Sequence, residues 1–177
     1  MNKIKKMVLI ALLISQALVL HYIEGFFPVL LPGVKLGLAN IITLITIVLF
    51  GFKEAIAVVV IRSVLGPILG GNPTSILYSL SGGILSSLIM SLLYFKYRRY
   101  FSLIGISTAG AVFHNIGQLL VASWVFGTIS ILYTYLPVLM IAAAVAGYFI
   151  GLASHYVLRF LNVHIIKPSM KKKAKKG

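Results

Sequence analysis

Few side chains in this sequence could bind a ligand, because charged residues make up only 10% of its 177 positions and hydrophobic residues make up 60%. Long apolar stretches are nevertheless interrupted by strongly polar residues, above all Arg62, His114, Asn115 and Gln118. An arginine at the centre of a membrane helix costs about 3 kcal/mol or more. Arg62 should therefore face the interior of a helix bundle and meet a partner there.

Two cations, Arg62 and Lys35, each allow a structural and a functional interpretation. Arg62 either pairs with Glu24 or with backbone carbonyls for packing alone, or it binds an anionic or strongly polar ligand, since charges inside membranes are usually functional. Glu54, the only other acid, lies about 12 Å from Arg62 along the same predicted helix. Lys35 either extends to the membrane surface or contacts a ligand or Glu24.

A polar stripe runs along the apolar segment 102–126 at helical spacing. Because the residues are three or four positions apart, they share one helical face. Such a face either forms hydrogen bonds between helices or lines a binding site. With Asn40 and Arg62 it would form a deep polar pocket, and Glu24, Lys35 and Asn72 would lie at its outer mouth. The stripe comprises Ser107, Ala111, His114, Asn115, Gln118 and Ala122.

Six uninterrupted apolar runs predict the helices that position these residues. A membrane-spanning helix needs roughly 20 apolar residues, and the runs lack the polar–apolar alternation of barrel strands. We therefore expect an all-α integral membrane protein with six transmembrane helices in residues 1–166, followed by a basic tail at 167–177. The predicted spans are residues 7–22, 34–50, 55–69, 76–95, 102–126 and 136–161.

The basic residues predict the orientation of these spans. The net charge is +14, with 16 Lys and Arg against 2 acids. All but Lys35 and Arg62 precede the first span, lie at the end of the last one or after it, or lie in alternate loops. Basic loops remain on the cytoplasmic side, so both termini should be cytoplasmic in a multi-pass protein of the cell membrane. The basic tail is expected to contact anionic membrane lipids and not nucleic acid.

Several catalytic and cofactor classes lack the residues they need. The chain has no Cys and no Gly-rich phosphate loop, and its two acids cannot form an Asp-rich site for magnesium and a diphosphate. No serine–base–acid set has a suitable acid. A zinc site is not expected either, because the remaining histidines lie near helix ends and the two acids are not at ligand spacing. We therefore expect no enzyme activity, no metal and no cofactor; the composition favours binding or translocation.

Three motifs resemble the Gx transporter family, often labelled heptaprenyl diphosphate synthase component I. They are PGVKLGLANIITL at 32–44, YSLSGG at 78–83 and HNIGQ at 114–118, and the resemblance covers all six spans. The family is similar to the substrate-binding (S) components of energy-coupling factor transporters. This similarity implies an S-component-like bundle with an outward-facing pocket, which docks on a transmembrane coupling subunit and a pair of ATPases. It also implies that Ala11 and Ser15 form the docking face.

Two functions remain open from the sequence. In the first, the chain is the substrate-binding component of an energy-coupling-factor-type uptake transporter and captures a small molecule. In the second, it is a non-catalytic accessory subunit that binds a prenylated lipid or quinone, associated with prenyl diphosphate or menaquinone metabolism or with membrane electron transfer. The residues predicted to bind the substrate are Glu24, Lys35, Asn40, Arg62, Asn72, Tyr78, His114, Asn115 and Gln118.

Overall fold

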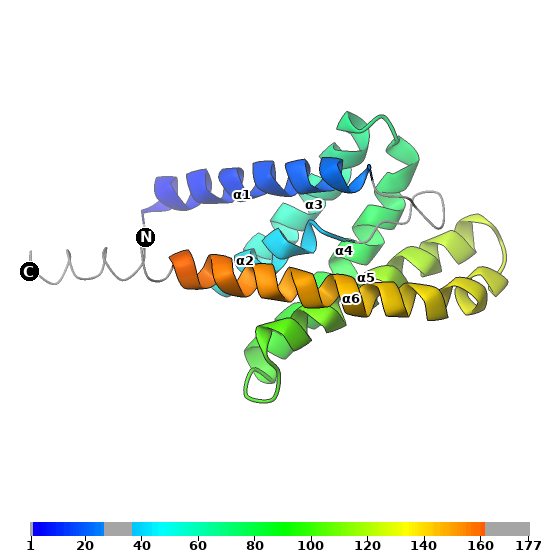
Figure 1. Cartoon of the computed structure of the whole chain (residues 1–177). Coiled ribbons are helices and arrows are strands. Elements are labelled where there is room, and N and C mark those ends of the chain that lie inside the picture. The colour runs from blue at the N-terminus through cyan, green and yellow to red at the C-terminus, as the bar shows by residue number, and fades with distance from the viewer. Residues whose placement is uncertain (1, 27–36, 162–177) are drawn as a thin grey trace, which may run out of the picture.

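The computed structural model describes residues 2–26 and 37–161, and this part of the chain is all-helical (Figure 1). It has no strands, as the apolar runs predict. A short 3₁₀ helix, η1, covers Pro73–Ser75. The α-helices are α1 (Lys3–Glu24), α2 (Asn40–Phe50), α3 (Phe52–Leu69), α4 (Ile76–Lys96), α5 (Leu103–Val125) and α6 (Ser130–Leu161).

Four of these segments are long and apolar enough to cross a membrane: α1, α4 together with η1, α5 and α6. The helix α3 has 18 residues but includes Lys53, Glu54 and Arg62. The helix α2 has 11 residues and is about 16 Å long, about half the thickness of a bilayer core. The structure therefore supports a membrane-embedded helical protein, while the count of six spans stays a prediction.

The start of α2 differs from the predicted span, which began at residue 34. Gly37 has a φ of 85°, which glycine adopts readily because it has no Cβ and which is incompatible with an α-helix. Leu38 and Ala39 form a turn, and the helix begins only at Asn40. The first described residues of this region are therefore a turn that enters the bundle, followed by a short helix.

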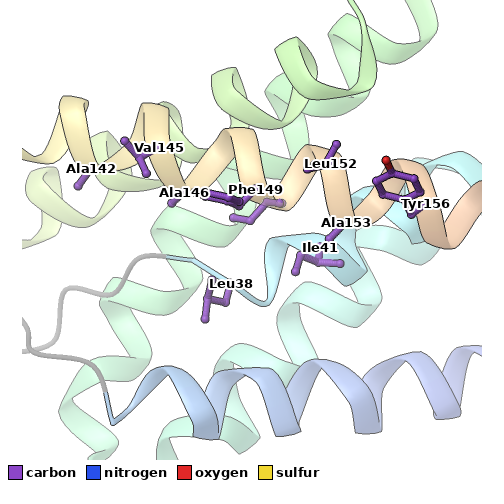
Figure 2. A pocket seen from close by; sticks show the side chains of 10 residues that line it. Leu38, Ile41, Ala142, Val145, Ala146, Phe149, Leu152, Ala153 and Tyr156 are labelled. Carbon is purple, nitrogen blue, oxygen red and sulfur yellow. The ribbon is translucent and has the colours of Figure 1, made fainter.

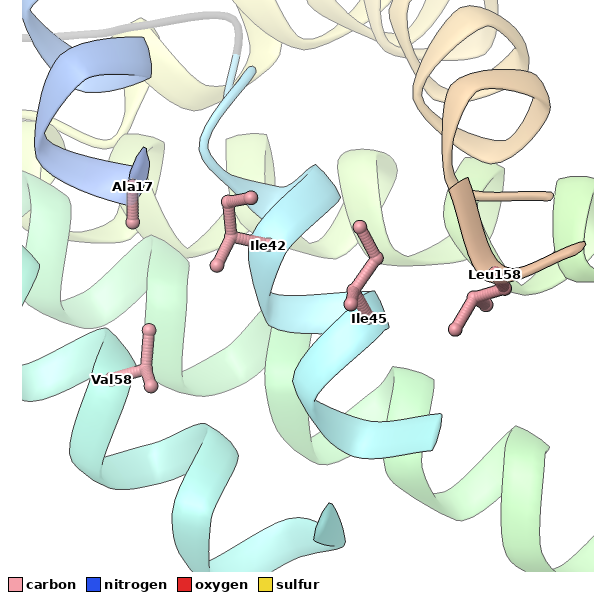
Figure 3. Packing of buried hydrophobic residues seen from close by; sticks show 5 residues of the cluster. All are labelled: Ala17, Ile42, Ile45, Val58 and Leu158. Carbon is pink, nitrogen blue, oxygen red and sulfur yellow. The ribbon is translucent and has the colours of Figure 1, made fainter. Parts of the chain in front are cut away.

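The bundle is built around α5, which packs between α4 and α6, while α3 contacts α4 and α1 lies on α2 and α3. Ala17, Ile42, Ile45, Val58 and Leu158 are buried and form an apolar cluster contributed by α1, α2, α3 and α6 (Figure 3). The core thus brings together helices that are far apart in the sequence.

The helix ends also show where charge collects. The beginning of α1 and the end of α6 lie at the same end of the molecule (Figure 1). There Lys6 of α1 forms an ion pair with Glu54 at the start of α3, before its apolar part. The hydrogen bond from Lys6 lowers the pKa of the Glu54 carboxyl. The basic beginning of α1 and the basic end of α6 thus lie at one end of the molecule, as the charge pattern predicts. The cytoplasmic orientation of that end stays a prediction.

Close packing of α4 against α5 predicts that an alanine at Gly117 destabilises the protein. A Cβ there would lie 2.8 Å from the backbone oxygen of Ser81 and 2.9 Å from Cα of Gly82, so the helices must separate at a cost of about 1–3 kcal/mol. Gly105 is the matched control, since a Cβ there meets Phe101 at an ordinary 3.5 Å. Thermal unfolding in detergent should show a lower Tm for Gly117→Ala than for wild type, and an unchanged Tm for Gly105→Ala. Equal Tm values for the two variants would contradict this close packing of α4 on α5.

Candidate functional site: a buried polar cluster

The Arg62 side chain lies at the centre of the candidate site. It is 1% exposed, and its Nη2 donates to Oδ1 of Asn40 on α2 at 3.0 Å. Gly83 of α4 faces the same group, because a Cβ added there would lie 3.2 Å from Nη2. The guanidinium therefore occupies space that α4 leaves open by having no side chain at this position.

Glu24, the last residue of α1, provides the negative charge near Arg62. Its Oε1 accepts hydrogen bonds from the backbone N–H groups of Gly37 and Leu38, the second at 3.1 Å. Glu24 is also close enough to Arg62 for an electrostatic attraction. The carboxylate therefore connects the end of α1 to the turn before α2 and partly balances the buried cation.

The polar face of α5 completes the site with His114 and Gln118. These side chains are one turn apart, and Nε2 of each lies 3.0 Å from the other. The His114 ring packs against Gly37 and Gly82, where an added Cβ would approach the ring to 3.1 Å and 2.9 Å. The sequence-predicted stripe on α5 thus faces both the turn before α2 and the middle of α4.

His21 of α1 is part of the site, although the sequence analysis did not include it. Its side chain is 3% exposed and packs on Gly66 of α3, where a Cβ would approach the ring to 2.6 Å. His21 also interacts electrostatically with His114. The spacing could have revealed it, since His21 is three residues before Glu24 and shares its helical face. We call the following residues the polar cluster: His21, Glu24, Asn40, Arg62, His114 and Gln118.

Asn115 and Asn72, two of the other predicted binding residues, lie outside the polar cluster. Asn115 points toward α6, where its Nδ2 donates to the carbonyl of Leu139 at 2.9 Å. Asn72 is exposed in the turn between α3 and α4, and its Oδ1 accepts from Thr74 Oγ1 at 2.6 Å. Tyr78 is buried on α4, and Lys35 lies outside the described residues. The structure thus groups Glu24, Asn40, Arg62, His114 and Gln118, and a role in ligand binding stays a prediction for all nine.

Among the described residues, Nε of Arg62 and Nδ2 of Asn40 are buried donors without a hydrogen-bond partner. An unsatisfied buried donor costs about 1–3 kcal/mol, and more when it is charged. Both atoms belong to residues already joined by a hydrogen bond. The arrangement is therefore suited to a ligand with acceptor oxygens, such as a carboxylate. The hydrogen bond between the two side chains holds these donors in place.

A separate cavity of about 730 Å³ lies between the start of α2 and α6 (Figure 2). None of the predicted binding residues that the structure describes lines it. Its lining is apolar and comprises Leu38, Ile41, Ala142, Val145, Ala146, Phe149, Ile150, Leu152, Ala153 and Tyr156.

The predicted docking residues, Ala11 and Ser15, are on the exposed part of α1. The Ser15 hydroxyl donates to the carbonyl of Ala11 at 3.0 Å, so its polarity is satisfied within the helix. A face with two small residues permits a neighbouring helix to approach closely. Whether a partner occupies it is not tested by the fold.

The fold and the cluster define a class: a helical, membrane-embedded protein with a polar centre enclosed by apolar helices. The chain belongs to the heptaprenyl diphosphate synthase component I family, whose model matches residues 13–157. This match confirms the family resemblance of the three motifs. Comparison with curated proteins gives no match, and comparison with solved structures gives none either.

The Arg62–Asn40 contact predicts non-additive effects of substitution. Asn40→Leu removes the acceptor while the guanidinium stays buried, which should lower the free energy of unfolding by about 2–3 kcal/mol. Arg62→Met in the same chain removes the orphaned charge, so the double variant should be more stable than Asn40→Leu alone. The free energy of unfolding is measured in mixed micelles for wild type, the two single variants and the double variant. Strictly additive losses would show that the two side chains are not coupled.

Proposed function

We propose that the chain is the membrane-embedded substrate-binding component of an energy-coupling-factor-type uptake transporter. It captures a small molecule at the polar cluster from the side of the cell membrane opposite its two termini. A separate transmembrane coupling subunit and a pair of ATPases reorient it. The chain itself performs no catalysis.

One observation carries the proposal: in the part of the chain that the structure describes, the buried pair of Arg62 and Asn40 retains two donors without a partner. Packing alone would be served better by apolar residues, since a buried charge is costly to keep. The negative charge of Glu24 lies nearby, where its Oε1 accepts hydrogen bonds from the backbone N–H groups of Gly37 and Leu38. Nε of Arg62 and Nδ2 of Asn40, which have no hydrogen-bond partner within residues 2–26 and 37–161, suit a ligand with acceptor oxygens.

Replacement of Arg62 tests the site. The full-length protein is purified from native membranes, and the small molecules released by denaturation are identified by mass spectrometry. We expect wild type to release one water-soluble compound, and Arg62→Ala to release about tenfold less or lower, because a hydrogen bond to a charged group contributes about 1.5–3 kcal/mol.

The control for this experiment is Arg99→Ala, an equal charge change in the exposed loop between α4 and α5. It should leave the yield of the compound unchanged. Both variants must elute as folded protein by size-exclusion chromatography. If Arg62→Ala folds and retains as much compound as wild type, Arg62 serves packing and the proposed site is wrong.

A second experiment tests the partner. Phenylalanine at Ala11 should block a helix that approaches α1 closely and reduce co-purification of a coupling subunit and ATPases. Leu9→Phe is the control, because Leu9 is 43% exposed on the same helix and, two residues before Ala11, lies on another face of it. Equal recovery of partners with both variants would exclude Ala11 from the interface, and no recovery with wild type would contradict the transporter role.

The family description favours a second candidate, an accessory subunit that binds a prenylated lipid or quinone and assists a prenyl diphosphate synthase or an electron-transfer complex. That description names one component of a synthase, and the apolar cavity beside α6 is compatible with a greasy ligand. The compound released from wild type separates the two functions. A polyprenyl species or quinone supports the accessory role, and a water-soluble compound supports the transporter.

A further inference from the structure

The cavity between α2 and α6 exists because α2 is short. Among the described residues α1 and α6 do not contact each other, and α2 lies between them with 11 residues. Leu38 and Ile41 form the side of the cavity next to α2 (Figure 2). On α6 the lining residues recur every three or four positions from Ala142 to Tyr156, so they lie on one face of that helix.

The dimensions of the cavity favour a single hydrocarbon chain over a helix. From residue 142 to 156 the face of α6 extends about 21 Å, and a volume of about 730 Å³ over that length gives a mean width of about 7 Å. An α-helix with its side chains is about 10–12 Å wide, which exceeds this width, so a helix would lie across the open side of the cavity and leave it unfilled. A hydrocarbon chain does, because carbon atoms make contact at about 4 Å.

The lining of the cavity and its exposure indicate that the hydrocarbon chain belongs to a membrane lipid. Among the described residues of the lining, the Tyr156 hydroxyl is the only side-chain polar group, so water beside them would lack hydrogen-bond partners. Val145, Phe149 and Tyr156 are 55%, 61% and 60% exposed, which means that the cavity opens on the outer surface of the bundle. In a membrane-embedded protein this surface faces lipid.

Positive charge lies at one end of the cavity. Arg159 follows Tyr156 by three residues, is exposed and belongs to the last turn of α6. The beginning of α1, with Lys3 and Lys5, is at the same end of the molecule (Figure 1). Each basic residue near a membrane surface attracts anionic headgroups by about 1 kcal/mol. The opposite end, at Ala142, has no charge in its lining.

We propose that this cavity binds one hydrocarbon chain of an anionic phospholipid, with the headgroup beside Arg159 and the chain extending toward Ala142. The site uses no residue of the polar cluster and does not depend on the proposed transport function. Leu38 and Ile41 flank the turn and helix start that contain Asn40, and Leu38 also donates to Glu24. The bound chain would therefore support the segment that positions the polar cluster.

Native mass spectrometry of the delipidated full-length protein tests the site, with phosphatidylglycerol and phosphatidylcholine as probes. Wild type should retain one phosphatidylglycerol, in preference to phosphatidylcholine by about fivefold, which is the effect of about 1 kcal/mol from one basic residue. Arg159→Gln should lose this preference, and Arg99→Gln, in the loop after α4, should keep it.

The chain-binding part is tested with a matched alanine pair on α6. Ala146 lines the cavity, whereas Ala144 is exposed and outside it. Ala146→Trp should fill the cavity and reduce phosphatidylglycerol retention about tenfold, and Ala144→Trp should not, because its ring lies on another face of the helix. Equal retention by the two variants would overturn the proposal, as would retention of a prenyl quinone in place of phospholipid by wild type.

A photoreactive benzoylphenylalanine provides a readout that does not depend on the folding of Ala146→Trp. It replaces Phe149, which lines the cavity, or its neighbour Tyr148, which is exposed and does not. After purification into detergent with one equivalent of phosphatidylglycerol, the lipid should crosslink at position 149 and not at 148. Equal crosslinking at both positions would show unspecific lipid adsorption and contradict the site.

Discussion

The burial of the Arg62 guanidinium is the constraint on which the arrangement of the other helices depends. A charge enclosed by apolar helices needs acceptors and an opposite charge. Asn40 supplies the acceptor at 3.0 Å, and Glu24 supplies the charge. Because Glu24 also accepts from the backbone of Gly37 and Leu38, the end of α1, the turn before α2 and the middle of α3 are positioned together. The relative positions of these three segments therefore depend on the Arg62 side chain.

Glycines make room for this polar centre. Gly37 and Gly82 contact the His114 ring, Gly83 faces Arg62 and Gly66 receives His21. An imidazole and a guanidinium can be enclosed side by side only because these four positions have no Cβ. The short α2 has a second consequence, since its first turn contacts the polar cluster through Asn40 and the apolar cavity through Ile41. One segment thus separates a site suited to a polar ligand from a site suited to a hydrocarbon chain.

The sequence predicts the all-helical class and most of the polar cluster, because polar residues in apolar runs must face inward. Arg62, Asn40, His114 and Gln118 are grouped for that reason. Asn115 was grouped with these residues by its spacing, but it is one residue after His114 and therefore points in another direction around the helix. Its side chain donates to the carbonyl of Leu139 on α6. The predicted start of the second span was wrong, because the positive φ at Gly37 follows from tertiary contacts and not from hydropathy. The cavity could not be predicted either, because it depends on how far α2 reaches between α1 and α6.

Thiol labelling beside Arg62 tests most directly whether the polar cluster is a ligand site reached from outside. The chain has no Cys, and Ser63, buried on α3 beside Gly83, accepts a near-isosteric Ser63→Cys substitution. Because an outward-facing site must open to admit its ligand, a membrane-impermeant, water-soluble thiol reagent should reach this buried cysteine in intact cells from the side opposite the termini. The compound released from wild type should slow the reaction when it is added back. Labelling only from the side of the termini, or none by any reagent while the protein is folded, would contradict an outward-facing ligand site.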